Sequence, residues 1–475
     1  MDDFFLYNTR TRKIEALAQR EPGKIRMYTC GPTVYHFAHI GNLRSYVMED
    51  VLEKALSYAG YEVTRAMNIT DVGHLVSDAD TGEDKMLLGA KREHKSVMEI
   101  ASFYTDAFFA DCKKLNVKRP KIVERATSCI GDYVALIERL FERGYAYAAG
   151  GNVYFDTSKL NEYHVLTRHK SGELFSAVRD NVEEDANKRN KADFALWFTK
   201  SKFDGQELRW ESPWGLGYPG WHIECSAISM KHLGEYLDLH CGGVDNIFPH
   251  HTNEIAQSEA ALGHAWCAHW FHVHHLTQKS GKMSKSSGEF LTLSLLEERG
   301  YPPPAYRYFC LQSHYRKPLE FSFEALDNAN AAYRKLLKRV SELRDEGDYG
   351  EAAAAAFRKD FSAALCNDLN TAKALSVVYD VIKSDASGKT KLAVLREFDG
   401  VFSLGLGEVG AEATAPDEAF ARLVEAKIAE RNAARARKDF KWADAIRDEL
   451  AAFGVSIKDG HEGTAWSFGE GGMKV

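Results

Sequence analysis

The segment between residues 24 and 70 constrains the fold more than any other part of the sequence. Lys24–Cys30 is a strand-like run, Gly31-Pro32 marks a turn, Asn42–Tyr58 carries apolar residues at helical spacing, and Tyr61–Thr70 is again strand-like. Strand, turn, helix and strand in this order predict a βαβ unit, whose crossover is right-handed and whose ligands bind at the carboxyl ends of the strands. We therefore expect an α/β, Rossmann-like domain with a site near Cys30 and Thr70.

The 475 residues are enough for several domains. The βα pattern is interrupted by a stretch with a helical pattern at Ile122–Arg143 and a charged run near residue 180, and it resumes near Trp210. After Leu326 helical patterns dominate, and a Gly/Ala/Glu-rich linker precedes two helical segments, 418–438 and 441–453. The expected organisation is a catalytic domain in two halves (1–111 and 206–325), an inserted connective segment (112–205), an α-helical bundle (326–404), and a linker with a small helical or mixed C-terminal domain (405–475).

Charge and cysteine content exclude some classes of protein. With 61 Lys and Arg against 68 Asp and Glu, the net charge of −7 excludes a uniformly basic nucleic-acid coat but allows a local basic patch. The eight cysteines are scattered, the first residues lack the features of a signal peptide, and no stretch is apolar enough to span a membrane. We expect a cytoplasmic protein with reduced thiols and no membrane association.

A phosphate-binding helix start is predicted at His39-Ile-Gly-Asn42. The free backbone N–H groups and the positive end of the helix dipole attract phosphate there, and a glycine lets a nucleotide approach closely. His36 and His39 add two imidazoles. The alternative, an ordinary helix start with surface histidines, fits this tetrapeptide equally well.

A second motif is Lys282-Met-Ser-Lys-Ser286, which glycines flank on both sides. Two lysines and several hydroxyls on such a loop suit a mobile clamp on a triphosphate. A solvated basic loop is the alternative.

Four further residues form a candidate zinc shell. Cys30 stands at a strand end, Cys225 follows a tryptophan-rich turn, and His250 and Glu254 are four residues apart on a predicted helix. Two thiolates, an imidazole and a carboxylate complete a tetrahedral Zn²⁺ shell. Spacing leaves two alternatives open: His251 with Glu254 also fits, and isolated buried cysteines are often inert core residues.

In combination these motifs resemble class I aminoacyl-tRNA synthetases, and the order of all of them resembles the cysteinyl-tRNA synthetase family over essentially the whole chain. The resemblance implies a zinc bound by Cys30, Cys225, His250 and Glu254, with Thr70 and Trp221 lining the amino-acid pocket. It implies catalytic roles for His39, Lys282 and Lys285, with Mg²⁺ accompanying ATP. The implied ATP-binding residues are His36, His39, Gly41, Asn42, Lys282, Met283, Ser284, Lys285 and Ser286.

Three positions depart from the pattern of the family. Asn42 replaces a frequent second histidine, Cys241 replaces the first of three usual glycines, and Val72-Gly73-His74 replaces an acidic pair after Asp71. The first is a common variant. The other two put in doubt how the ribose and the loop after Thr70 are arranged.

RNA contacts are expected in the C-terminal third. Lys427, Arg431 and Arg435 recur every four residues, so they line one helical stripe suited to phosphates, and Trp442 and Trp466 are candidates for stacking on unpaired bases. A solvated face and core tryptophans are the alternatives. The expected partners are tRNA(Cys), ATP and L-cysteine, and the expected state is a monomer.

The resulting hypothesis is a cysteine–tRNA ligase that forms cysteinyl-adenylate from ATP and transfers cysteine to the 3′ end of tRNA. One rival is a cysteine:amino-sugar ligase of the mycothiol type, which shares the adenylation chemistry but lacks a full anticodon-binding region. The other is a non-catalytic tRNA-binding paralogue. The residues after 330 argue against the first rival, and the two retained nucleotide motifs argue against the second.

Overall fold

The computed structural model describes residues 2–72, 75–77, 81–84, 96–167, 185–200, 208–278, 281–282, 291–407, 418–437, 439–452, 455–460 and 463–468. The chain forms two compact units, Met1–Leu406 and Gly407–Val475. Among the described helices, none is both long and apolar enough to cross a membrane.

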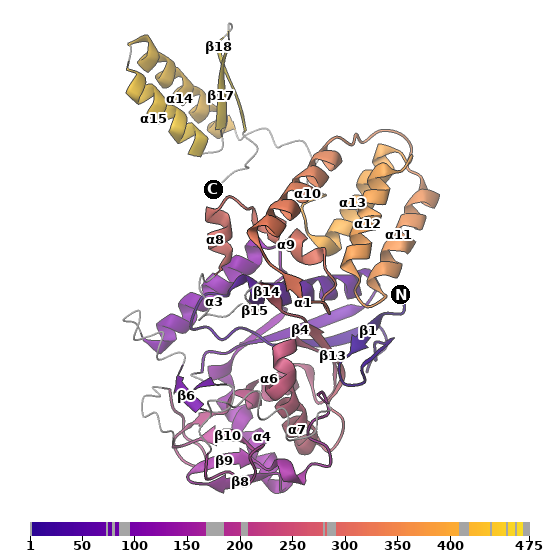
Figure 1. Cartoon of the computed structure of the whole chain (residues 1–475), viewed down its shortest axis with the longest axis vertical. Helices are drawn as coiled ribbons and strands as arrows, with labels where there is room; N and C mark the ends of the chain where they lie inside the picture. Colours follow the sequence, from indigo (N-terminus) through magenta and orange to yellow (C-terminus); the bar gives the residue numbers. More distant parts are fainter. Residues whose placement is uncertain are drawn as a thin grey trace. The chain divides into compact units, whose positions relative to one another are not determined.

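A five-stranded parallel sheet is the centre of the first unit (Figure 1). Its order is β13-β12-β3-β4-β7, with bounds Cys267–Val273, Leu237–Gly243, Lys24–Thr29, Glu62–Ile69 and Ile122–Arg125. The chain runs outward from β3 through β4 to β7 and then returns to β12 on the other side of β3. The strand order therefore reverses between β3 and β12, which is where open parallel sheets form a crevice for ligands. The βαβ prediction is confirmed.

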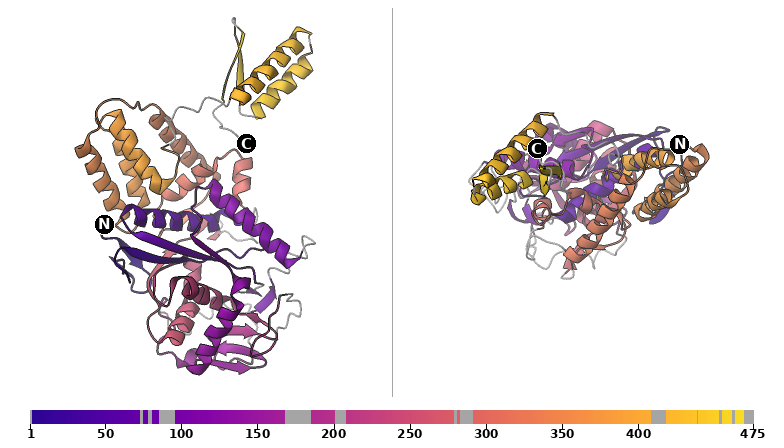
Figure 2. Two further views of the ribbon diagram at one scale, coloured as in Figure 1. Left: turned by 180° about the vertical axis from the view of Figure 1, so that it is seen from behind. Right: turned by 90° about the horizontal axis from the view of Figure 1, so that it is seen from above.

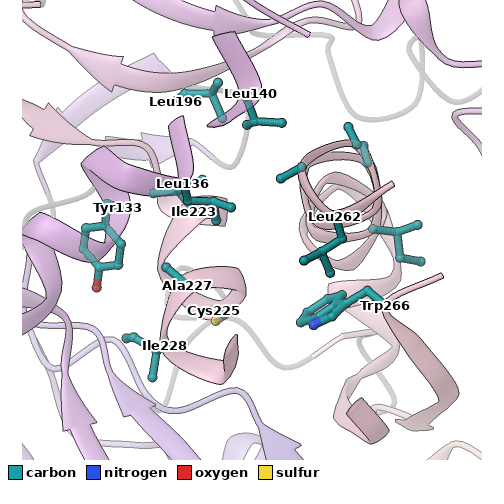
Figure 3. Close-up of a cluster of buried hydrophobic side chains, with 14 of the residues drawn as sticks. Tyr133, Leu136, Leu140, Leu196, Ile223, Cys225, Ala227, Ile228, Leu262 and Trp266 are labelled. Carbon is teal, nitrogen blue, oxygen red and sulfur yellow. The ribbon is translucent and has the colours of Figure 1, made fainter. Parts of the chain in front are cut away.

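Helices cover both faces of this sheet (Figures 1 and 2). Helix α1 (Ile40–Tyr58) lies on one face, and α4 (Ile130–Glu142), α6 (Trp221–Leu233) and α7 (Thr252–Leu262) lie on the other. Figure 3 shows how Leu136, Ile223, Ala227 and Trp266 fill the core on the second face, with the Cys225 sulfur among them. This tight packing fixes α6 against the sheet.

The predicted helix Ile122–Arg143 is wrong in its first turns. Residues Ile122–Arg125 are strand β7, which pairs in parallel with β4, and a 3₁₀ turn (Ala126–Cys129) precedes α4. The adjacent β-branched Ile122 and Val123 favour the extended form, and the pairing with β4 supplies their backbone hydrogen bonds. The edge strand of the central sheet thus lies inside the range proposed for the inserted segment.

The inserted segment contributes three strands of an antiparallel sheet of order β11-β10-β9-β8, and the edge strand β11 comes from the second half of the catalytic domain. The strands are Tyr218–Pro219, Phe194–Phe198, Asn152–Phe155 and Ala146–Ala149. Other elements of the first unit are short hairpins, connecting strands and helices. They are β1 (Phe5–Asn8), β2 (Lys13–Ala16), β5 (Leu75–Ser77), β6 (Thr81–Asp84), α3 (Val97–Lys114), β14 (Leu276–Gln278), β15 (Gly281–Lys282), α8 (Leu293–Glu298), α9 (Pro303–Leu311) and β16 (Leu319–Glu320).

A helical bundle completes this unit, as the sequence predicts (Figure 1). Its helices are α10 (Phe323–Ser341), α11 (Glu351–Leu365), α12 (Thr371–Lys383) and α13 (Gly388–Phe402). The helical patterns rich in Ala, Leu, Lys, Arg and Glu carried the prediction. The structure adds that Ser322, Asn370 and Ser387 cap three of these helices.

The second unit pairs α14 (Glu418–Ala436) and α15 (Phe440–Ala452) with a hairpin of β17 (Val455–Gly460) and β18 (Gly463–Phe468). Both helices match the predicted segments to within two residues. The hairpin supplies the strands of this domain. The core side chains of the second unit are Val424, Ile428, Ile446, Leu450 and Val455.

Candidate active site and metal cluster

A pocket of about 350 Å³ opens at the reversal of strand order. The loop after β3, the start of α1, and the carboxyl ends of β12 and β13 form its walls. Its lining residues include Cys30, His36, His39, Gly41, Asn42, Glu49, Trp221, Gly242, Gly243 and His274. Five of the eleven residues that the sequence predicts for the nucleotide and the amino acid therefore meet in one cavity: His36, His39, Gly41, Asn42 and Trp221.

The start of α1 is closed by a reciprocal cap. The His39 Nδ1 accepts a hydrogen bond from the Asn42 backbone N–H at 3.1 Å, and the Asn42 Oδ1 accepts one from the His39 backbone N–H at 3.3 Å. Asn42 therefore has a structural role in the cap of α1, which the sequence analysis did not predict. A Cβ on Gly41 would lie 2.9 Å from the His39 ring, so the glycine also makes room for the cap.

The second nucleotide motif is tied to the same helix. Lys282 is the last residue of β15, which pairs with β14. Beyond the motif, Leu291 O accepts a hydrogen bond from Ile40 N–H at 2.8 Å, and Thr292 forms a β-bridge with His39. The predicted residues Met283, Ser284, Lys285 and Ser286 lie outside the described residues.

The four predicted metal ligands, of which Cys30 is one, lie close together. Their ligand atoms are all within 4.8 Å of one another. The Cys30 and Cys225 sulfurs are 3.8 Å apart, and the His250 Nε2 is 3.1 Å from the Glu254 Oε1. The loop after β3, α6, the turn Ile247–His251 (η4) and α7 each supply one ligand.

The alternative that the spacing leaves open is also present. Cys30, His240, His251 and Glu254 form a second group of the same kind. The His251 Nε2 lies 3.3 Å from the Cys30 sulfur, and the His240 Nε2 lies 2.9 Å from the Glu254 Oε2. The two groups share Cys30 and Glu254, so they describe one cluster with two ways to complete it.

Electrostatics indicate that this cluster fits a cation. Burial raises the pKa of both Cys30 and Cys225 and raises the pKa of Glu254 to about 8, while it lowers the pKa of His240 to about 3. The Oε1 atom of Glu254 is buried and accepts no hydrogen bond from the part of the chain that is described. A divalent metal favours the deprotonated ligands that burial disfavours, so two sulfurs, an imidazole and a carboxylate suit a metal ion here.

Further histidines support the cluster from outside. The His250 Nδ1 lies 2.9 Å from the His222 Nδ1, and the His251 Nδ1 lies 2.8 Å from the His272 Nε2. Hydrogen bonds of this kind fix the ring orientation and tautomer of a ligand. The sequence analysis missed His222 and His272; their proximity in sequence to Cys225 and to a strand end was the available signal.

The two predicted amino-acid-binding residues have different positions. Trp221 lines the pocket, and its ring centroid is 4.6 Å from that of His250. Thr70 is 1% exposed, is absent from the pocket lining, and donates its hydroxyl hydrogen to Glu224 at 2.9 Å. Its backbone bonds Pro32 and Val34, so Thr70 supports the loop that carries the pocket wall.

Gly31 shows how tightly this loop is built. A Cβ at this position would lie 1.6 Å from the backbone oxygen of Asn68, and the Gly31 N–H donates to the Asn68 side chain at 2.8 Å. Of the atypical residues, Cys241 is fully buried in β12 and His74 lies outside the described residues. The neighbours of Cys241, Gly242 and Gly243, line the pocket.

In the second unit, the predicted basic stripe is unevenly exposed. Arg435 is exposed, Lys427 is half-buried and 3.9 Å from Glu430, and Arg431 is only 8% exposed. Trp442 is 47% exposed, whereas Trp466 packs against the small core. Arg435 and Trp442 are therefore the more accessible of the predicted RNA contacts.

Comparison with known proteins gives three family matches. Residues 16–331 match the tRNA synthetases class I (C) catalytic domain, residues 360–406 match the DALR domain, and residues 417–466 match the cysteinyl-tRNA ligase anticodon binding domain. A cysteine–tRNA ligase of Treponema denticola is 45% identical over 97% of this chain and 99% of its own length. Cysteine–tRNA ligase 1 of Burkholderia lata is 44% identical over 96% and 95%.

Solved structures agree on the fold. Methionyl-tRNA synthetase of Mycobacterium tuberculosis, bound by methionyl-adenylate, has a TM-score of 0.56 at 14% identity, covering 81% of this chain and 93% of the other. The ternary complex of Agrobacterium radiobacter K84 LeuRS with tRNA and LeuAMS has a TM-score of 0.56 at 11% identity, covering 84% and 86%. Together with the sequence matches, these findings show that the chain belongs to the cysteine–tRNA ligase family of class I aminoacyl-tRNA synthetases.

Proposed function

We propose that this protein is a cysteine–tRNA ligase that activates L-cysteine with ATP and transfers it to the 3′ end of tRNA(Cys). The observation that carries the proposal is the position of Cys30, where a two-sulfur metal cluster and a phosphate-binding helix start border one pocket. The full-length identity to curated ligases supports the same activity.

We propose Zn²⁺ as the resident metal, held by Cys30, Cys225, His250 and Glu254. When bound, Zn²⁺ supplies a soft Lewis acid that takes a substrate thiolate but gains little from a hydroxyl. Cys30 and Trp221 line the pocket and Trp221 packs against His250, so the proposed ligand set borders the place where the substrate would bind. Shape alone discriminates poorly between cysteine and the near-isosteric serine, so the ligand set carries the selectivity.

The other wall of the pocket suits ATP. In the first step the substrate carboxylate attacks the α-phosphorus and pyrophosphate leaves. The Ile40 and Asn42 N–H groups at the start of α1 are bonded to Leu291 O and to His39, so the positive end of the helix dipole, rather than a set of free N–H groups, attracts the phosphates there. His39, Lys282 and Lys285 stabilise the charge that develops, with Mg²⁺ accompanying ATP. In the second step a terminal ribose hydroxyl of tRNA attacks the adenylate, so no protein nucleophile is needed.

We propose that the second unit, residues 407–475, reads the anticodon region of the tRNA. Its match to an anticodon binding domain supports this role. Lys427, Arg431 and Arg435 are the proposed phosphate contacts, and the exposed Trp442 is the proposed stacking platform. Because Arg431 is nearly buried, its replacement should affect the stability of this unit more than its salt-dependent RNA affinity.

A truncated chain ending at Leu406 tests both roles together. It should exchange pyrophosphate into ATP with cysteine as the full chain does and should lose much of its ability to charge tRNA. Full-length protein without cysteine-dependent exchange would refute the ligase activity. Full charging by the truncated chain would instead refute the RNA role of the second unit. Cysteine-dependent exchange without tRNA charging by the full chain would favour a cysteine:amino-sugar ligase.

A further inference from the structure

Arg44 is a buried cation on α1, close to both nucleotide motifs. The residue is fully buried, and its guanidinium donates hydrogen bonds only to backbone carbonyls. The Nη1 atom donates to His274 O at 2.8 Å and His275 O at 2.7 Å. The Nη2 atom donates to Lys317 O at 2.8 Å and, more weakly, to His314 O at 3.5 Å. No carboxylate among the described residues pairs with it, and its Nε finds no acceptor there.

Burial of such a charged side chain costs free energy. An uncompensated charge costs several kcal/mol of desolvation, and carbonyl dipoles offset that cost only if the geometry is fixed. The arrangement therefore holds Arg44 and the four carbonyl groups in one rigid group. A role in packing alone does not require a charge at this position.

The carbonyl groups belong to the segments that lead into strands β14 and β16. His274 and His275 directly precede β14, and Lys317 lies two residues before β16, which pairs in parallel with β14. Strand β14 pairs with β15, whose last residue is Lys282. Arg44 thus connects the second turn of α1 to the strands that lead to Lys282.

The far end of the motif is attached to the same helix. Ile40 N–H donates to Leu291 O at 2.8 Å, and His39 bridges Thr292. The chain from β14 to Thr292 therefore starts and finishes on α1, at Arg44 on one side and at the helix start on the other.

We propose that Arg44 is a positioning residue for adenylate formation. It fixes β14 and β15 relative to the phosphate-binding start of α1, so that Lys282 and Lys285 meet the phosphates where negative charge develops. This inference rests on the proposed function of the motif, and Arg44 itself does not touch the substrates.

The test uses Arg44→Gln and Arg44→Lys in the full-length protein, assayed by cysteine-dependent pyrophosphate exchange. A shift of the lysines on the order of 1 Å costs about 100-fold in rate, so kcat should fall about 10–100-fold in Arg44→Gln. The KM for cysteine should stay unchanged because the sulfur-binding cluster lies on other elements. Arg44→Lys keeps a cation but loses the forked donor and should recover only part of the rate.

A double-mutant cycle with Lys285→Ala separates positioning from general destabilisation. If Arg44 acts through the motif, Arg44→Gln should cost little further rate in the Lys285→Ala background. Arg307→Lys is the matched control, because this second fully buried arginine binds Asp50 and Phe402 O away from the motif. Its rate effect should add independently to that of Lys285→Ala.

Additive losses for Arg44 and Lys285, or an unchanged kcat in a folded Arg44→Gln or Arg44→Lys variant, would overturn the inference. In either case the unmodified protein would still perform cysteine-dependent exchange. Absence of that exchange would instead refute the proposed function, so the two failures are distinguishable.

Discussion

The sulfur side and the phosphate side of the pocket are built in different ways. On the sulfur side, Cys225, His250 and Glu254 are at most 3% exposed and stand on regular elements packed into the core. On the phosphate side, one motif stands at the start of α1 and the other begins at Lys282, the last residue of β15. Preformed, buried ligands suit the selection of a ground-state feature, the thiol. Accessible donors suit charge that appears only in the transition state.

The largest effect should come from removing the sulfur side. In Cys225→Ala/His250→Ala protein, bound metal should be lost, and the preference for cysteine over serine should fall by roughly 10⁴-fold, as expected when a site loses the group that recognises its substrate. Metal analysis and exchange with the two amino acids measure this. ATP binding should remain and serves as the control. Full metal occupancy in the double variant would contradict the ligand assignment.

A smaller effect is expected on the phosphate side. Lys285→Ala should lower kcat for pyrophosphate exchange about 100-fold or more while the affinity for cysteine is retained, since the lysine meets developing charge. Steady-state kinetics with each substrate varied check this split. An unchanged kcat with a raised KM for ATP would show that the motif binds the ground state, and the contrast between the two sides would disappear.

Glu49 lies between the two sides and gives a prediction for stability. Its carboxyl lines the pocket at 1% exposure, and its Oε2 has no hydrogen-bond partner among the described residues. Burial raises the pKa of Glu49 from 4.5 to about 8. The folded state therefore keeps a proton that the unfolded state has lost, and stability should fall as the pH rises from about 4.5 to 8.

Glu49→Gln removes this titration. The variant should gain stability over the unmodified protein as the pH rises, on the order of 2 kcal/mol by pH 8 after allowing for relaxation around a buried charge. Thermal or denaturant unfolding of both proteins at pH 5 and pH 8 provides the measurement. An equal difference at the two pH values would show that Glu49 has a cationic partner in the folded protein.

The smallest effect concerns the cap on α1. Asn42→Ala removes one half of the reciprocal cap and should cost about 1 kcal/mol of stability. Asn42→Asp keeps an acceptor for the His39 N–H and is the control. Chemical denaturation of the two variants tests the cap, and equal loss in both would show that the asparagine amide has another role.

The sequence predicts the parts of this site that depend on one local pattern. Strand, turn and helix in the first 70 residues place Cys30 and His39 at one edge of a sheet, and the structure agrees. The sequence does not reveal which other residues lie at the same edge of the sheet as Cys30 and His39. Thr70 stands at such an end, yet its side chain turns to Glu224, and the choice between His250 and His251 depends on where α7 begins.

Long-range pairing accounts for the remaining differences. Ile122–Arg125 becomes a strand because β4 offers it an edge, and the β17–β18 hairpin closes over the small core of α14 and α15. Arg431 shows the same limit, because the four-residue spacing places it on a stripe but does not reveal that this stripe is partly covered.

Gly31 has a consequence for how this gene can vary. Every amino-acid change at the position adds a Cβ, and that atom would overlap the Asn68 carbonyl of the neighbouring strand. Relief would require β3 and β4 to separate at the point where Cys30 begins the metal cluster and the pocket wall follows. A single missense change in this codon should therefore damage metal retention and nucleotide use together, and a compensating change elsewhere would have to move a whole strand.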